Sequence, residues 1–259
     1  MKKYQVYVNP YDQCAVDRLT IIEFHRFTIS DTELLRFVPS LSPFATKLEA
    51  YLRFFGINYK TVLEPNLDNA PRGKVPFISV DGVRISDSDL IVSFLKAALF
   101  DPDADLNPAQ KAIGHLVQRT LEEHLYWVNL YYEFFDNNGS DFFFKSAYGG
   151  HSALTEAIRD EFAARTYDQG IARYTPREIV DKAGKDLVAV SQVLGDHGFI
   201  LGTDKPTSFD AAVFGIILSV FQARGMHPEL TDFARGISNL RQYIKRLLAA
   251  YFPELGAAF

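Results

Sequence analysis

Cysteine is nearly absent from this sequence, because the 259 residues include only Cys14. A single cysteine cannot form a disulfide within the chain or build a zinc site on thiolates. The six histidines are dispersed without the spacing of metal ligands, so we expect no metal site. Long apolar runs are also lacking, since no window reaches the roughly 18 uninterrupted apolar residues of a transmembrane segment.

The chain also lacks an excess of positive charge, with 27 lysines and arginines against 32 acidic residues. The formal net charge is −5, and the lysines and arginines are scattered along the chain. This pattern argues against nucleic acid as the main partner and leaves room for a small anion held locally. The N-terminal residues MKKYQVYVNPYDQ place polar residues and a proline where a signal peptide needs an apolar core. We therefore expect a cytoplasmic protein.

The first half of the chain begins with a β-α-β pattern. Residues 19–24 and 59–63 are short apolar runs that predict buried strands. Between them, apolar residues recur at helical spacing from Pro43, with Lys47 and its polar neighbours on the opposite side, and Gly56 is a typical helix end. Two strands connected in this way should be parallel and adjacent.

A predicted hairpin and a second helix complete this half. Two apolar runs between residues 74 and 85 flank Asp81-Gly82, which is a strong signal for a two-stranded turn. A helical pattern follows from Ser88. The segment 100–108 then carries two prolines and three aspartates with little to bury, and it predicts a linker.

Everything beyond the linker predicts helices, apart from residues 136–151, which are rich in Asn, Gly and Phe and are expected to be irregular. The predicted helices cover 108–135, a part of 152–166, 176–194, 208–223 and 236–250. Thr175-Pro176-Arg177-Glu178 is a capping box, and Thr207 to Asp210 is an acidic version of it.

The predicted fold is therefore α/β plus all-α. Residues 1–18 form an N-terminal extension, 19–99 a small α/β domain, 100–108 the linker and 109–259 an all-helical domain.

The order β-α-β then β-β-α resembles an N-terminal thioredoxin-like domain, and a C-terminal helical bundle domain appended to it resembles the glutathione transferase superfamily. The segment Gly73 to Ile78 is similar to the one in which that superfamily places a cis-proline, and Ile85 to Ile91 resembles its acidic-Ser element. Leu41-Ser42-Pro43-Phe44 resembles the metaxin-like branch, which includes the failed axon connections proteins.

The helical half resembles the same branch. The matching segments are Leu121 to Trp127, Tyr174 to Ile179 and Pro206 to Phe214. The branch often has cysteine where this chain has Ala45, and many thiol-transferring relatives have cysteine at the position of Ser42. The absence of both excludes disulfide exchange at this site.

The resemblance implies that Ser42 is the catalytic residue. Glutathione must react as a thiolate, and the unperturbed pKa of a thiol is about 8.5. A helix N-terminus and a donated hydroxyl hydrogen bond both favour negative charge on sulfur, and Ser42 lies where the two meet. The alternative is that Ser42 only caps the helix, because Ser before Pro is a common helix start. Ser40 lies nearby and is the competing candidate for the contact with sulfur.

The resemblance also implies a glutathione-binding set of Lys74, Val75, Pro76, Asp87 and Ser88. A cis Val75–Pro76 bond would turn the backbone of Val75 toward the cysteinyl unit of glutathione, and a trans proline opening an edge strand is the alternative. The helix start at Asp87 and Ser88 would receive the γ-glutamyl group, although helix capping by Ser86 or Ser88 is compatible with this. Lys74 would meet the glycyl carboxylate or remain solvated.

An aromatic set on the first long helix of the helical domain would line the pocket for the second substrate. These residues are Tyr126, Trp127 and Tyr131, with Tyr132 beside them, and about half of the set should be core. Glu122, Glu123 and His124 are expected to be surface charges.

The resemblance implies an enzyme, a cytoplasmic glutathione transferase-like protein. It would use glutathione as co-substrate without a metal, add the thiolate to a small apolar electrophile, and form a homodimer. The alternative is a non-catalytic metaxin-like interaction or scaffold protein that has kept the fold.

Overall fold

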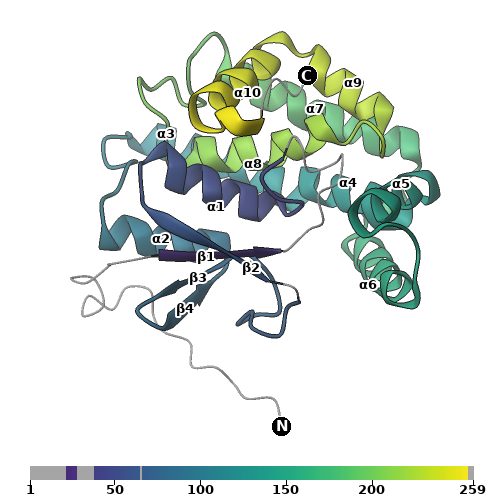
Figure 1. Cartoon of the computed structure of the whole chain (residues 1–259). Helices are drawn as coiled ribbons and strands as arrows, with labels where there is room; N and C mark the ends of the chain where they lie inside the picture. The colour runs from purple at the N-terminus through teal and green to yellow at the C-terminus, as the bar shows by residue number, and fades with distance from the viewer. Residues whose placement is uncertain (1–21, 28–37, 65, 256–259) are drawn as a thin grey trace.

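The computed structural model describes residues 22–27, 38–64 and 66–255. Figure 1 shows a small sheet on one side of the molecule and a layer of helices on the other. The predicted strand at 19–24 falls partly outside these residues, and the extension 1–18 lies wholly outside them. The two-part fold, an α/β domain followed by a helical one, is confirmed.

The sheet has four strands in the order β2-β1-β3-β4. The strands are β1 (Ile22–Phe27), β2 (Tyr59–Glu64), β3 (Phe77–Val80) and β4 (Val83–Ser86). β1 pairs with β2 in parallel and with β3 antiparallel, and β3 and β4 form the predicted hairpin around Asp81-Gly82. Gly82 has a φ of 81°, and Asp81 also has a positive φ, as a tight turn between two strands requires.

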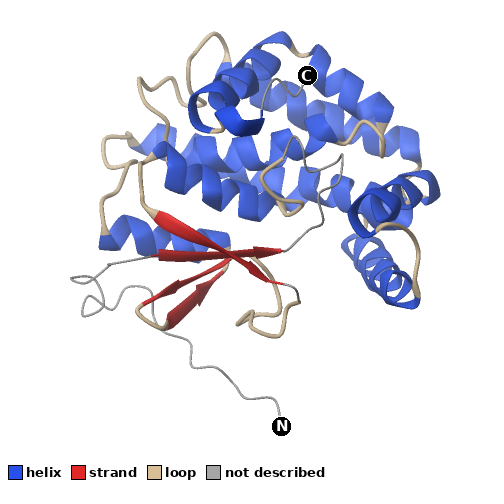
Figure 2. Ribbon diagram, in the orientation of Figure 1, coloured by secondary structure: helices blue, strands red, loops and turns tan. Residues whose placement is uncertain are grey.

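Two helices belong to the same domain, α1 (Pro43–Phe54) and α2 (Ser88–Ala98). Figure 2 shows both between the sheet and the helical layer. Gly56 follows α1 with a φ of 62°, a left-handed conformation that suits glycine at a helix end.

The helical domain starts with one long helical segment from Pro108 to Phe135. Its parts are α3 (Pro108–Thr120), a π-helical turn (Leu121–Leu125), α4 (Tyr126–Leu130) and a second π-helical turn (Tyr131–Phe135). The remaining helices are α5 (Asn137–Tyr148), α6 (Ala153–Gln169), α7 (Pro176–Leu194), α8 (Ser208–Gln222), α9 (Pro228–Gly236) and α10 (Ser238–Tyr251), with short 3₁₀ turns at Ile171–Arg173 and Pro253–Leu255.

The sequence did not predict α5, so the expectation of an irregular stretch at 136–151 was wrong for most of its length. Asp136 caps this helix by accepting a hydrogen bond from the Gly139 backbone at 2.8 Å. A Cβ at Gly139 would lie 2.3 Å from the Tyr132 carbonyl oxygen, so this glycine permits close packing and does not break the helix. The helix α9 was also missed.

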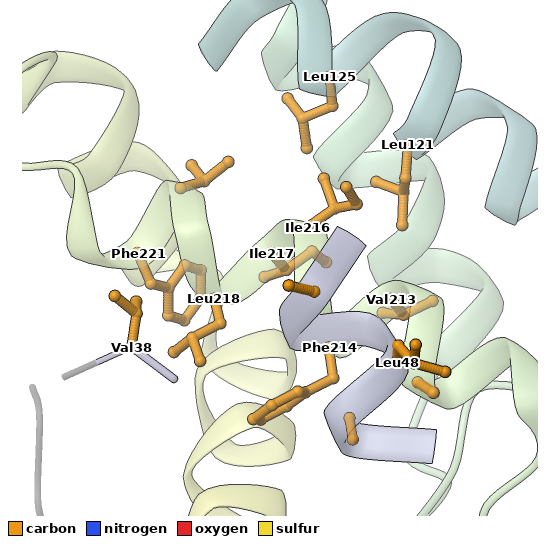
Figure 3. Packing of buried hydrophobic residues seen from close by; sticks show 14 of the residues in the cluster. Val38, Leu48, Leu121, Leu125, Val213, Phe214, Ile216, Ile217, Leu218 and Phe221 are labelled. Carbon is orange, nitrogen blue, oxygen red and sulfur yellow. The ribbon is translucent and has the colours of Figure 1, made fainter. Parts of the chain in front are cut away.

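The core joins the two domains, because α1 packs mainly against α8. Figure 3 shows Leu48 of α1 beside Val213 and Phe214 of α8, all three fully buried. Gly215 allows the close approach, since a Cβ there would lie 2.6 Å from the Pro43 carbonyl oxygen. The start of α1, which carries Ser42, is therefore held directly against the helical domain.

The start of α8 is fixed by the acidic capping box that the sequence predicted. Asp210 is fully buried, and its carboxylate accepts hydrogen bonds from the backbone and hydroxyl of Thr207, each at 2.7 Å. It also accepts from the Ile200 backbone and the Tyr243 hydroxyl, both at 2.8 Å. The Asp210 side chain thus connects α8 with α10 and with the loop that precedes α8.

A buried histidine lies in the helical domain. His227 contacts Asn129 at 3.2 Å and the Thr231 hydroxyl at 3.1 Å, and it is 3% exposed. Burial lowers the pKa of His227 from 6.5 to about 4, because the charged form would lose its hydration. The folded protein therefore keeps this ring neutral where the unfolded chain would protonate it.

Stability is accordingly expected to fall with acid through this residue. The contribution of His227 is fully present above pH 6.5 and is lost as the pH falls toward 4, since only the unfolded state takes up the proton. At pH 4.5 the loss should be about 2–3 kcal/mol relative to pH 7. Urea unfolding of wild type and His227→Gln at both pH values measures it. A pH dependence equal in the two proteins would contradict this assignment.

No helix among the described residues is both long and apolar enough to span a bilayer.

Candidate functional site

Ser42 is the N-cap of α1. Its Oγ accepts a hydrogen bond from the Ala45 backbone at 3.3 Å, and Ser40 Oγ accepts one from the Ser42 backbone at 3.2 Å. In the described part of the chain, no acceptor takes the hydroxyl hydrogen of Ser42. Because a hydroxyl can accept and donate at once, the cap leaves Ser42 able to donate to a sulfur anion.

Pro76 follows a cis peptide bond, as expected for the Val75–Pro76 pair. Both residues are buried, and they lead directly into β3. Lys74 is exposed on the approach to this bond.

Asp87 is the N-cap of α2, the role that the sequence analysis considered for Ser86 or Ser88. Its carboxylate accepts hydrogen bonds from the backbones of Asp89 at 3.0 Å and Leu90 at 3.2 Å. Asp87 is exposed with a φ of 79°, and Ser88 is buried in the first turn. The Asp87 carboxylate thus already accepts hydrogen bonds from two N–H groups at the start of α2. The sequence analysis expected such N–H groups to bind the ligand.

The cis-proline and the start of α2 lie side by side. Phe77, just after Pro76, pairs with Ser86, just before Asp87, across β3 and β4. Asp89 in the first turn of α2 in turn pairs with Lys47 of α1. The fold therefore brings the cis-proline close to the start of α2, and the start of α2 close to α1.

An ionic cluster joins α1 and α2 to α3 and the π-helical turn after it, and it is buried at Lys47 and Glu122 and partly exposed at Asp89 and Arg119. Lys47 is 2% exposed and donates to Asp89 and to Glu122, the latter at 2.6 Å. Arg119 pairs with the same two carboxylates, at 2.7 Å for Glu122, and Gln118 donates to both. The positive charges lower the pKa of Asp89 despite its burial. Two cations thus balance two anions at the domain interface.

This cluster corrects two expectations. Lys47 was placed on a polar face of its helix and Glu122 among surface charges, but both are buried, because α1 packs against α8 and α2 and the two side chains pair with each other. Glu123 is exposed as expected, and His124 pairs with Asp186 on α7.

The predicted pocket aromatics divide into two groups. Tyr131 and Tyr132 are buried core residues, 5% and 7% exposed. Tyr126 and Trp127 are half-buried, and the ring of Tyr126 packs edge-on against Phe44 at 4.8 Å between centroids. Tyr126 therefore lies beside the first turn of α1.

A small pocket opens next to the same turn, with room for about 20 Å³, roughly one water molecule. Its lining residues are Val38, Ser40, Leu41, Glu133, Phe143, Ser219, Gln222, Ala223 and Met226. The sequence analysis considered only Ser40 among them. The others come from separate elements, and Glu133 lies on a π-helical turn, where the ordinary helical spacing no longer predicts which side a residue faces.

Metal ligands were not expected, and the described residues contain no group of three or more His, Cys, Asp or Glu that could hold an ion.

Two family models match the chain. They are the glutathione S-transferase N-terminal domain over residues 43–139 and the glutathione S-transferase C-terminal domain over 183–247. One relative is the isoprene-epoxide glutathione S-transferase of Rhodococcus sp. strain AD45. It is 32% identical over 83% of this chain and 94% of its own length.

Two further relatives come from animals. Failed axon connections of Drosophila melanogaster is 26% identical over 90% of this chain, which spans 59% of that protein. Metaxin-2 of Homo sapiens is 25% identical over 81% of this chain and 82% of its own length.

Among solved structures, the glutathione transferase GSTFuA2 from Phanerochaete chrysosporium has the same fold. Its TM-score is 0.64 at 15% identity, covering 89% of this chain and 98% of that one. The family models and the Rhodococcus relative show the family, and the solved structure shares the fold. The chain belongs to the glutathione S-transferase family, with metaxins and Failed axon connections among its relatives.

Proposed function

We propose that this protein is a glutathione transferase that adds the glutathione thiolate to a small apolar electrophile. The observation that carries the proposal is the start of α1, where Ser42 caps the helix and keeps its hydroxyl hydrogen for a sulfur anion. The helix dipole favours the same negative charge. Both effects lower the pKa of a bound thiol, which raises the thiolate fraction at neutral pH.

The binding of glutathione is supported by the cis-proline and by the first residue of α2. The backbone of Val75 would pair with the cysteinyl unit, and exposed Lys74 would meet the glycyl carboxylate. Because Asp87 binds the N–H groups of Asp89 and Leu90, the Ser88 hydroxyl and N–H would receive the γ-glutamyl carboxylate. Asp87 would attract the γ-glutamyl ammonium through charge, because its carboxylate is exposed while it caps the helix.

The kind of electrophile is supported by one relative. The Rhodococcus relative is named for an epoxide. We propose a small apolar epoxide as the second substrate of this chain.

Calorimetric titration of glutathione into wild type and Ser42→Ala tests the proposal. We expect millimolar or tighter binding in both, since most contacts are made by other residues, and conjugation that is at least tenfold slower in Ser42→Ala. If neither protein binds glutathione at millimolar concentration, the proposal is wrong, and a non-catalytic protein like the metaxins becomes the better description.

A further inference from the structure

The segment between β2 and the cis-proline has no regular structure of its own. Its described residues, 66–76, form turns without a helix or a strand. Two of these turns are closed by backbone hydrogen bonds of 3.0 Å, from the Ala70 N–H to the Leu67 carbonyl and from the Gly73 N–H to the Ala70 carbonyl. Most of the segment before the cis-proline is at least half-exposed, so its position depends on the contacts that it makes with the sheet.

Asn69 connects this segment to both outer strands of the sheet. Its Nδ2 donates a hydrogen bond to Oε2 of Glu64, the last residue of β2, at 3.2 Å. Its backbone carbonyl accepts a hydrogen bond from Nη1 of Arg84 on β4 at 3.0 Å. β2 and β4 are the two edges in the order β2-β1-β3-β4. The segment therefore cannot shift along or away from the sheet without breaking one of these bonds.

The carboxylate that Asn69 binds is itself held by a buried histidine. Nδ1 of His25 on β1 lies 2.6 Å from Oε1 of Glu64, and its Nε2 lies 2.9 Å from Oγ of Ser79 on β3. All three side chains are buried. Burial disfavours the charge of Glu64, but hydrogen bonds from His25 and Asn69 outweigh it and lower the pKa of this carboxyl. The ionised carboxylate only accepts hydrogen bonds, so both neighbours donate to it.

His25 also supports the far end of the segment. Its ring stacks on Phe77 with 4.0 Å between the ring centroids and 14° between the planes. Phe77 follows the cis-proline directly. The two residues before that proline, Lys74 and Val75, therefore lie between one support at Asn69 and another at Phe77.

We propose that Asn69 is a positioning residue for glutathione. Through its bond to Glu64 it holds the turns so that the Val75 backbone and the Lys74 ammonium are in place before the ligand arrives. Ordering a loop during binding costs affinity, so a segment that is ordered beforehand binds more tightly. The inference rests on the proposed function, which assigns Val75 and Lys74 to glutathione, and adds a residue that acts through them.

Calorimetric titration of glutathione into wild type, Asn69→Ala and Asn69→Asp tests the proposal. We expect the Kd for glutathione to rise about threefold in Asn69→Ala, because one hydrogen bond that orders the segment is lost. In Asn69→Asp it should rise about tenfold, because a second carboxylate then faces that of Glu64. The kcat for styrene oxide at saturating glutathione should stay within about twofold of wild type in both variants, since the start of α1 is unchanged.

An exchange of donor and acceptor isolates the pair from other effects of the substitution. In the double variant Asn69→Asp, Glu64→Gln, the new amide can donate to the new carboxylate while its oxygen still accepts from His25. We expect the Kd of the double variant to return to within about twofold of wild type. Asn66→Ala is the matched control, because the Asn66 side chain accepts from the Asp68 backbone within the segment, and it should leave the Kd unchanged.

The outcomes distinguish this role from the proposed function. An unchanged Kd in Asn69→Asp, or a loss of affinity that the double variant does not recover, would overturn the inference and leave the proposed function intact. A kcat that falls as much as the affinity would also overturn it, because a positioning role in binding does not alter the reacting atoms. A wild type that binds no glutathione at millimolar concentration would overturn both.

Discussion

Replacement of Asp210 by alanine is expected to lower the free energy of unfolding by about 3–5 kcal/mol. The carboxylate is fully buried and accepts four hydrogen bonds, from two groups of Thr207, from Ile200 and from Tyr243. Alanine would leave these donors buried without partners, and each unpaired buried donor costs about 1–3 kcal/mol before relaxation. The midpoint of urea unfolding measures the loss.

Two variants refine this prediction. Asp210→Asn keeps the shape but offers an NH₂ group where the Thr207 donors need an acceptor, so it should lose a large part of the same energy. Asp204→Ala changes an exposed carboxylate in the preceding loop and should shift stability by less than about 0.5 kcal/mol. A loss below about 1 kcal/mol in Asp210→Ala would show that the capping box does not hold α8.

Replacement of Lys47 by methionine is expected to cost about 3 kcal/mol, because it leaves two acids to share one cation at the domain interface. The double variant Lys47→Met, Glu122→Leu removes one charge of each sign and keeps the Arg119–Asp89 pair. It should recover most of the lost stability, since apolar residues of similar volume replace a buried ion pair at little cost.

Urea unfolding of the two single variants and the double variant gives the coupling energy directly. We expect a coupling of about 2 kcal/mol between Lys47 and Glu122. Additive losses would mean that the two side chains do not interact in solution. Glu123→Ala, next in sequence and exposed, is the control and should be nearly neutral.

The backbone of the fold could be predicted from the sequence because its local signals agree. Short apolar runs, the Asp81-Gly82 turn and the capping boxes at Thr175 and Thr207 all specify elements that the structure contains. α5 could not be predicted in this way. Its Asn and Gly residues are typical of loops, and Gly139 is required there by contact with a turn that precedes it.

Site residues could be predicted from the sequence only where they lie in one short stretch that is recognisable by itself. Ser42, Pro76 and Asp87 lie in short recognisable stretches, and the pairing of β3 with β4 brings the last two near each other. Lys47 and Glu122 look like surface charges in sequence, because their burial depends on packing between domains. Glu133 was missed for a further reason, since a π-helical turn changes which side of the helix a residue faces.

A serine before a helix, such as Ser42, can cap the helix or donate a hydrogen bond to a bound sulfur. The structure confirms the cap, and the free hydroxyl hydrogen allows the second role at the same time. Two substitutions separate these roles. Alanine removes both, whereas aspartate keeps a capping oxygen and places a negative charge where the thiolate would lie.

The most direct test of this account is the ultraviolet absorbance of bound glutathione thiolate, followed across pH in wild type, Ser42→Ala and Ser42→Asp. We predict a thiol pKa at least about one unit below the free value of 8.5 in wild type, near 8.5 in Ser42→Ala, and above it in Ser42→Asp. The same depressed pKa in all three proteins, with glutathione bound in each, would contradict the claim that Ser42 activates the sulfur.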